Sequence, residues 1–415
     1  MAKTADLNIS LKDKALPLMM EYGIYAFAFL MFAGRLGTVR EIGLYAPPSI
    51  WLINCTLEKR FDIELKSPLF VLLVLLSISA LISTIGSTNL LDALHLVKGE
   101  YLKMILLFIA IPAAFPTNER LGRFARFLSL SGIAYLFFGA YRISGDLIKT
   151  GVIQYMKTRD YATIIMFFLP FIIFRSIESR GFKRALWIAL VLAGIAEIIV
   201  IGVRGSWIAL FVVLCVWAYF IMRAYAKQLF SAIKVLSTLL LAITSVAVIF
   251  FIAFPAQYNF IKKHTSQKIQ LSLRFETWKG FLAMSKDSLL LGRGIDDNAM
   301  KERYKKFYES THGNPPEDIP ITPHNQFIKI LYQQGILGLG LYALLLTILV
   351  FVIWKRFPAL MLKNNGAMLG IAITTSVIGE YIIRCMSEDR SLIPLGVLIG
   401  MAGAFLKSEP GRDRD

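Results

Sequence analysis

The chain has 415 residues, of which 56% are hydrophobic, and its mean hydropathy is +0.61. A soluble domain is about 45–50% apolar even when glycine is counted, so this composition excludes an ordinary soluble domain and favours a protein that crosses a bilayer many times. The net charge is +17, yet Lys and Arg lie in the gaps between apolar runs and form no compact nucleic-acid-binding module. Basic residues placed in this way predict topology control and contact with membrane lipid or phosphate, and no nucleic acid partner.

The first apolar run begins near residue 17, after a mixed and polar N-terminal stretch. It is too long for the core of a signal peptide and lacks a clear cleavage site, so we predict a retained first span. Twelve apolar runs are candidates for spans, although the second and fourth are short enough to be tilted or partly re-entrant. The candidate spans are 17–34, 42–56, 68–86, 100–115, 124–141, 161–174, 185–202, 205–222, 235–254, 324–354, 366–385 and 391–406.

The distribution of Lys and Arg orients these spans. With the N-terminus in the cytoplasm, the loops on that side hold roughly twice as many basic residues as the short loops on the other side. The predicted fold is an all-α polytopic membrane protein of about 12 transmembrane helices, with both termini cytoplasmic. We divide the chain into 1–254 with spans 1–9, an outward loop at 255–322, 323–407 with spans 10–12, and a cytoplasmic tail at 408–415. In a bacterium, the outward face of the inner membrane is the periplasmic face.

The outward loop at 255–322 is too long to be a passive connector. An amphipathic helix is predicted within it at 265–285, because four apolar residues recur there at helical spacing and form a stripe expected to be buried. These residues are Leu271, Phe275, Trp278 and Leu282. A second, polar helix is predicted at 296–310, after the turn Leu-Gly-Arg-Gly. We expect the loop to form a short, mostly helical domain over a cavity at the membrane surface.

His324 stands at the head of the tenth span. Thr322 is placed to cap a helix and Pro323 suits the first helical position, so we expect His324 in the first turn. The positive end of the helix dipole disfavours a charged imidazole, and a neutral His324 at that site can accept a proton near pH 7. Asn325 and Gln326 add amide groups that suit sugar hydroxyls or orient the ring. The alternative is a histidine that only caps the helix and contacts interfacial water, and the residue types alone leave these two interpretations about equal.

Two arginines fall on the same predicted face as His324. Arg204 lies between two apolar runs, where its guanidinium and the amides of the next helix suit a phosphate. Its alternative role is to set topology, but an outward-facing charge is not needed for that. Arg274 lies about 60° from the apolar stripe and flanks it, and alone it would be an ordinary surface charge. Together the three residues predict an anion-binding pocket that contains a base.

Other polar residues on this face are weaker candidates for contacts with a phosphate or with sugar hydroxyls, and each alone is more often an interfacial anchor. They are Asn325, Gln326, Trp278, Arg142, Arg159, Lys98 and Lys103.

The remaining charged residues and cysteines suggest structural roles. Glu380 and Arg384 lie four residues apart in the eleventh span, which predicts an intrahelical ion pair that is either structural or orients the cavity. The adjacent carboxylates Asp296–Asp297 and Glu388–Asp389 are expected to point apart, so neither pair predicts a metal site. The three cysteines are an odd number without paired spacing, which argues against a disulfide framework or a zinc site. We expect no metal and no cofactor.

Three segments together, "VRGSW", "LRFETWKGFLAMSKDSLLLGRG" and "PHNQFIKILYQQGILGLGLY", resemble the O-antigen ligase/polymerase superfamily of bacterial membrane glycosyltransferases. The resemblance covers about residues 195–345. It implies a GT-C-like membrane enzyme that transfers a glycan from undecaprenyl diphosphate at the periplasmic face without a metal, with inversion expected by analogy with the family. It assigns Arg204 and Arg274 to the diphosphate and His324 to activation of the acceptor.

The expected activity is that of an O-antigen ligase, with a sugar of lipid A-core as the acceptor. We prefer it to an O-antigen polymerase, whose acceptor is a second lipid-linked glycan, because the chain ends soon after its last span without a large soluble domain. A transporter of lipid-linked glycan is the alternative from another class. Polar residues that gather at one face and not at the midplane argue against it, as does the lack of an evident repeat.

Overall fold

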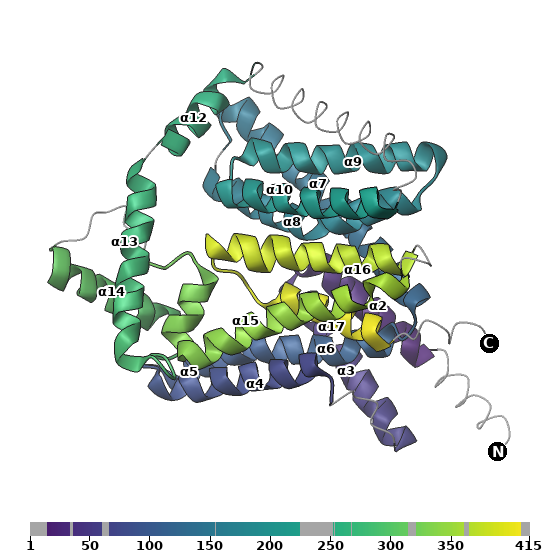
Figure 1. Cartoon of the computed structure of the whole chain (residues 1–415), viewed down its shortest axis with the longest axis horizontal. Helices are drawn as coiled ribbons and strands as arrows, with labels where there is room; N and C mark the ends of the chain where they lie inside the picture. Colours follow the sequence, from purple (N-terminus) through teal and green to yellow (C-terminus); the bar gives the residue numbers. More distant parts are fainter. Residues whose placement is uncertain are drawn as a thin grey trace.

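The computed structural model describes residues 15–33, 36–59, 66–153, 155–224, 252, 254–266, 268–313, 321–360 and 365–407, and all the regular secondary structure in these residues is helical. Figure 1 shows the long helices lying roughly side by side, with shorter helices across one end. Apolar side chains from most of the long helices form one large buried core. The predicted fold class, an all-α polytopic membrane protein, is confirmed.

Within the described ranges, seven helices are long and apolar enough to cross a membrane, judged by length and composition. They correspond to seven of the twelve predicted spans. They are α4 with the short helix η2 (Pro68–Ser83 and Thr84–Gly86), α7 (Asn118–Thr150), α8 (Tyr155–Glu178), α9 (Gly181–Ile201), α10 (Arg204–Ala224), α15 (Gln326–Leu360), and α16 with the helical turns η7 and η8 (Asn365–Ser376, Val377–Ile383 and Arg384–Met386).

The other five predicted spans do not belong to this set. Two of them are apolar helices of fewer than 18 residues, α2 (Leu16–Leu30) and α17 (Ile393–Lys407). Two more are helical without meeting the criteria for a span: α3 (Gly37–Glu58), and a continuous run made of α5 (Leu90–Val97), η3 (Lys98–Leu102) and α6 (Lys103–Ala114). The run from α5 to α6 carries several charged residues around η3, which lowers its hydropathy. The ninth predicted span, 235–254, lies outside the described residues except for 252 and 254.

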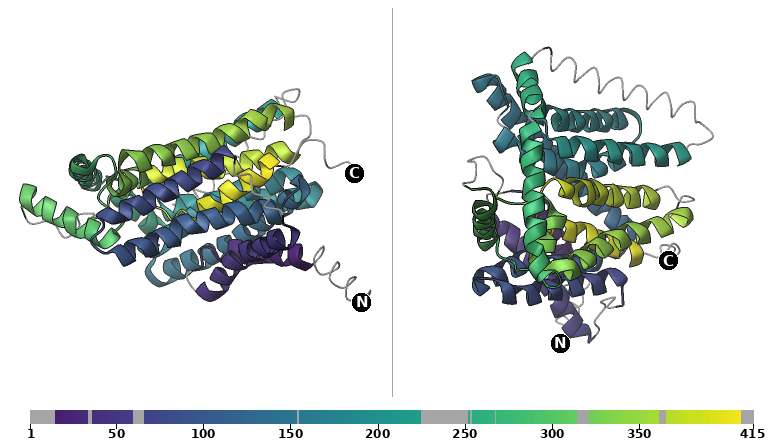
Figure 2. Two further views of the ribbon diagram at one scale, coloured as in Figure 1. Left: turned by 90° about the horizontal axis from the view of Figure 1, so that it is seen from below. Right: turned by 60° about the vertical axis from the view of Figure 1, so that its left-hand side comes forward.

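The packing of the helices places one set of helix ends together. α7, α8 and α9 pack against one another in chain order, and α16 lies against both α8 and α15. α17 packs along α6, and α4 packs along α15. The described parts of the long loop form α12 (Pro255–Ser266), α13 (Lys268–Ser285) and α14 (Asp297–His312), with the short turn η5 (Lys286–Ser288) between α13 and α14. Figures 1 and 2 show α12 and α13 crossing the ends of the long helices, where α10 and α15 begin.

The longest helix, α15, is broken at Gly335, whose φ of 68° and ψ of −167° are not helical. Such a break leaves backbone groups without helical partners, and these groups are costly to bury unless they are bonded. The segment 289–294 supplies the missing partners from the long loop. The bonds are Arg293 N–H to the Tyr332 carbonyl (2.8 Å), Gly294 N–H to the Gln333 carbonyl (3.1 Å) and Ile336 N–H to the Leu289 carbonyl (2.7 Å).

The long loop is also held to the part of α15 before the break, residues 326–334, which we call the head of α15. α13, α14 and the head of α15 share a small core made of Phe281, Met284, Met300, Tyr304, Tyr308 and Tyr332. The rings of Phe281 and Tyr304 stack at a centroid distance of 4.7 Å, and the ring of Phe281 meets that of Tyr332 edge-on at 5.3 Å. The loop therefore packs as one unit with the head of α15.

The helix predicted at 265–285 is confirmed as α13, but its predicted buried stripe is wrong. Phe275 is 53% exposed and Leu282 is 43% exposed, whereas Thr277 and Phe281 are fully buried. The cause lies in the partner helix: the ring of Tyr304 on α14 packs directly over Gly280, where a Cβ atom would overlap it. A small residue that admits a close aromatic neighbour decides the buried face here, and the hydrophobic period does not detect it.

Gly335→Ala should destabilise the protein because the new Cβ atom would overlap the carbonyl oxygens of Leu289 and Leu290 at a positive φ. We expect a loss of about 2 kcal/mol or more in the free energy of unfolding, measured by thermal unfolding in detergent. Gly340→Ala is the matched control in the same helix, since nothing lies within 4 Å of the added atom. Equal stability of the two variants would contradict the assigned role of the break.

Candidate functional site

The connection between η8 and α17, residues 387–392, joins parts of the site that are distant in sequence. Ser387 packs against Gly205 so closely that a Cβ atom at position 205 would overlap its hydroxyl. Gly205 follows Arg204, the first residue of α10. The carbonyl of Ser387 accepts a hydrogen bond from Nη1 of Arg274 at 3.4 Å. One residue of this connection therefore lies beside both predicted phosphate-binding arginines.

His324 lies before the helix and not in its first turn, so the predicted cap at Thr322 is wrong. α15 begins at Gln326, and Asn325 caps it: its side-chain oxygen accepts the N–H groups of the second and third helical residues at 3.0 and 3.1 Å. His324 has a φ of 44°, in the left-handed region that non-glycine residues rarely adopt. Such a conformation costs free energy and is held by the surrounding contacts.

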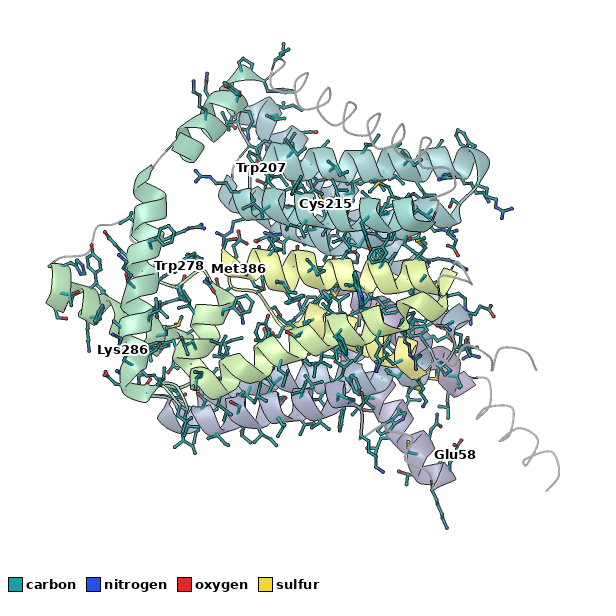
Figure 3. The ribbon with its side chains drawn as sticks, in the orientation of Figure 1. Glu58, Trp207, Cys215, Trp278, Lys286 and Met386 are labelled. Atoms are coloured by element: carbon teal, nitrogen blue, oxygen red, sulfur yellow. The ribbon has the colours of Figure 1, made fainter. Side chains whose placement is uncertain are left out.

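The contacts around His324 come from three elements. On the α13 side, the indole N–H of Trp278 donates to the carbonyl of Pro323 at 2.6 Å. On the other side, the side-chain amide of Asn325 donates to the carbonyl of Met386 at 3.0 Å. Figure 3 shows Trp278 and Met386 in the same region, at the end of the long helices. The two bonds clamp the residues on either side of His324.

The two nitrogens of the His324 ring have different neighbours. Nδ1 lies 3.6 Å from Oδ1 of Asp389, and Nε2 lies 3.2 Å from the hydroxyl of Thr322. When Nδ1 carries the proton toward the carboxylate, Nε2 is the nitrogen that can accept another proton. The side chains of His324 and Asp389 are 29% and 30% exposed, so the pair is reachable from solvent.

Asp389 is held in its charged form. Its interaction with His324 is the largest cause, and the positive charge of Lys329 adds to it, so the pKa of Asp389 lies well below its usual range although partial burial acts in the opposite direction. Nζ of Lys329 lies 3.6 Å from Oδ2 of Asp389. This carboxylate is the partner that the sequence did not provide for His324.

A buried charge network supports the connection 387–392. Arg384 is fully buried and bridges Glu380 at 3.2 Å and Glu388 at 3.1 Å. Arg390 also contacts Glu388, and burial, together with the positive charge of Arg384, lowers the pKa of Arg390 to about 10. The predicted pair of Glu380 and Arg384 is confirmed. Arg384 also pairs with Glu388, whereas Asp389 faces His324 and Lys329. The two adjacent carboxylates therefore point to different partners, as expected.

The weaker candidates divide into two groups. Gln326 lies at the site, where its side-chain oxygen accepts the N–H of Arg390 at 2.9 Å. Asn325 and Trp278 also lie there, through their bonds to Met386 and Pro323. Arg159 lies 3.8 Å from its neighbour Asp160, whose charge acts on Arg390. The remaining three candidates are Lys103, Lys98 and Arg142. Lys103 pairs with Glu41 of α3 at 2.8 Å, and Lys98 and Arg142 are exposed.

Sequence reasoning missed Asp389 and Lys329. A signal for Asp389 was present, because Glu388, Asp389 and Arg390 form a cluster of charges directly after an apolar run, at its outward end. Lys329 lies inside the tenth predicted span, and its spacing gave no sign of a role at the site. In the part of the chain that the structure describes, no three His, Cys, Asp or Glu side chains are grouped as metal ligands would be.

The arrangement supports two kinds of chemistry. Arg274 bonds to Ser387, and Arg204 precedes Gly205, which packs against the same residue; guanidinium groups in such a region suit an anion such as a phosphate, to which they donate strong hydrogen bonds. His324, oriented by Asp389, suits the transfer of a proton from a hydroxyl group. An anion-binding group beside a proton acceptor matches the needs of a reaction in which a phosphate leaves and a hydroxyl attacks.

Asp389→Asn should lower stability at pH 7, because the folded protein then loses a carboxylate that His324 and Lys329 stabilise. A carboxyl group whose folded pKa is depressed stabilises the fold above its unfolded value of about 3.8, and this contribution is lost as the pH falls below that value. The difference in unfolding temperature between the wild type and the variant should therefore narrow between pH 4 and pH 3. A constant difference down to pH 3 would contradict this assignment.

A comparison with known protein families gives a match. Residues 188–343 match the family model Wzy_C, described as O-antigen ligase. This range contains Arg204, Arg274 and His324 and ends before Asp389. No curated protein matches the chain. The family match confirms the resemblance to the O-antigen ligase/polymerase superfamily over this part of the chain.

Proposed function

We propose that the protein is a lipopolysaccharide O-antigen ligase. It transfers a glycan from undecaprenyl diphosphate to a sugar hydroxyl of lipid A-core, at the periplasmic face of a bacterial inner membrane, with both termini in the cytoplasm. The observation that carries this proposal is that Arg274, the start of α10 at Arg204–Gly205, and His324 all lie against the connection 387–392. The family match supports an enzyme of the O-antigen ligase/polymerase superfamily, and the preference for the ligase rests on the sequence argument given above.

The proposed reaction is a direct displacement at the anomeric carbon of the donor sugar. The acceptor oxygen forms the new bond to this carbon, the bond from the carbon to the diphosphate oxygen breaks, and its electron pair leaves with undecaprenyl diphosphate. The guanidinium groups of Arg204 and Arg274 stabilise the negative charge that develops on the leaving group. Attack from the face opposite the leaving group inverts the anomeric configuration.

His324 takes the proton of the attacking hydroxyl in this mechanism. Nε2 is the accepting nitrogen, because Nδ1 faces Asp389. The hydroxyl of Thr322, 3.2 Å from Nε2, occupies the position in which the acceptor hydroxyl would lie. Asp389 then stabilises the positive charge that the ring gains. The proposed mechanism uses no metal ion.

An O-antigen polymerase would use the same arginines and the same histidine, because it differs from the ligase only in the acceptor. A transporter of lipid-linked glycan would need the arginines but not a proton acceptor. The pairing of His324 with Asp389 at a reachable position therefore favours a transferase over a transporter.

His324→Ala should reduce transfer by about 10²-fold or more, the usual contribution of a general base. Arg274→Ala should cause a loss of about the same size by weakening the stabilisation of the leaving diphosphate. The measurement is glycan transfer by purified protein in detergent or vesicles. His312→Ala and Lys279→Ala, which change exposed residues at the end of α14 and on α13, are the controls for folding and insertion. Normal transfer by His324→Ala would show that the base is assigned wrongly.

The acceptor decides between the candidate activities. Purified protein is incubated with undecaprenyl-diphosphate-linked glycan and is offered either lipid A-core or a second lipid-linked glycan. We expect transfer to lipid A-core alone, with the same rate in the presence of EDTA. Chain extension of the lipid-linked glycan would identify a polymerase, and the absence of any covalent product would favour a transporter. A loss of activity in EDTA that Mg²⁺ restores would contradict the metal-independent mechanism.

A further inference from the structure

Lys329 belongs to the head of α15 and lies near carboxylates that come from other elements. Its Nζ lies 3.0 Å from Oδ2 of Asp297 and 3.6 Å from Oδ2 of Asp389, and its side chain is only 17% exposed. The positive charge of Lys329 also acts on the carboxylate of Glu100 on η3. The three carboxylates come from α14, from the connection 387–392 and from η3, so Lys329 links three separate elements by charge.

Asp389 is shared between Lys329 and His324. Its Oδ1 faces Nδ1 of His324, while its Oδ2 faces Nζ of Lys329. A carboxylate beside a histidine favours the charged ring, whereas a lysine on the far side of that carboxylate opposes it. With Lys329 present, Asp389 can orient the His324 ring through Nδ1 without supplying a full, uncompensated negative charge.

Asp297 controls how much of the Lys329 charge acts on Asp389. It is the nearer of the two partners, and Gln333, one turn further along α15, fixes its other oxygen with a hydrogen bond of 2.9 Å. Asp297 is the first residue of α14 and therefore belongs to the long loop. The position of the loop and the charge environment of the base are thus connected through two side chains.

We propose that Lys329 is a positioning residue that, by sharing Asp389 with His324, favours the proton-accepting form of the ring, and that Asp297 of the loop sets the strength of this effect. The role assigned to His324 rests on the proposed transferase function. The electrostatic connection between Lys329 and the His324 ring does not, and it can be measured without any transfer reaction.

Other charged groups of the site lie outside this connection. Arg274 approaches from α13, and Glu388 and Arg390 lie on the connection 387–392, where Arg384 of η8 compensates Glu388. None of the variants described below changes these residues. A shift in the pH profile of His324 modification in the Lys329 or Asp297 variants therefore comes from the substituted residue, because the other charged groups of the site are unchanged.

The experiment measures the rate at which diethyl pyrocarbonate modifies His324 as a function of pH, since this reagent reacts with the uncharged imidazole. Peptide mass spectrometry separates His324 from His95, which is exposed on α5 and serves as the internal reference. The wild type is compared with Lys329→Met, which removes the charge and keeps most of the side-chain length, and with Asp297→Asn. Lys305→Met, on the exposed face of α14, is the control for the loss of one positive charge.

The two variants should shift the midpoint of the His324 profile in opposite directions. Lys329→Met should raise it by roughly one pH unit, because Asp389 then stabilises the charged ring without opposition. Asp297→Asn should lower the midpoint of the His324 profile. Lys329 then has one carboxylate fewer beside it, so its charge acts more strongly on Asp389. Lys329→Arg should restore most of the wild-type profile, while Lys305→Met and the His95 profile should not change. Shifts of the same sign, or no shift in either variant, would overturn the proposal.

Transfer assays on the same variants separate this inference from the proposed function. If the wild type transfers glycan, Lys329→Met should move the acidic limb of the pH–rate profile to higher pH. The KM for the lipid-linked donor should remain almost unchanged. A purely structural role for Lys329 would lower the rate at all pH values without moving the limb. If the wild type transfers no glycan, the proposed function fails, and the modification profiles still decide whether Lys329 acts on His324.

Discussion

Helix α15 is broken at Gly335, and the long loop supplies hydrogen bonds to the backbone groups that the break leaves unpaired. The rest of the site depends on this constraint. Backbone groups freed at Gly335 must find partners in an apolar environment, and the segment 289–294 of the long loop provides them. The loop is therefore joined to the membrane helices by backbone pairing as well as by the aromatic core around Tyr332. This attachment brings α13, with Arg274, over the head of α15.

The site combines a buried network of ion pairs around Arg384 with a solvent-accessible pair, His324 and Asp389. Arg384 and its carboxylate partners are buried, and such a network is costly to disturb because removing one partner leaves an unpaired charge. It holds the connection 387–392, which in turn presents Ser387 and Asp389 to the residues of the site. His324 and Asp389 keep nearly a third of their side-chain surface exposed. A buried ionic support under a partly open pair suits a site that must keep its geometry while substrates enter and leave.

The sequence allowed the fold class, the helical nature of the long loop and three residues of the site to be predicted. Hydropathy and charge placement were sufficient for the helices because a bilayer span requires a long apolar run. The buried face of α13 was predicted wrongly, since the period of apolar residues identifies a stripe but not the helix that packs on it. The cap of α15 was assigned to Thr322 instead of Asn325 because both residue types suit a cap, and only the structure shows that the Asn325 side chain accepts the first free N–H groups of the helix.

By itself, the sequence determined that this chain is a helical membrane protein with basic residues between its spans, and that Arg204, Arg274 and His324 belong to one family pattern. These conclusions depend on composition and on local spacing, which the order of residues contains directly. Only the tertiary structure decided which side chains meet: that Asp389, 65 positions after His324 in the chain, faces its ring, and that Lys329 shares this carboxylate with Asp297. Contacts between distant segments depend on how the helices pack and on where α15 breaks, and local spacing carries no record of either.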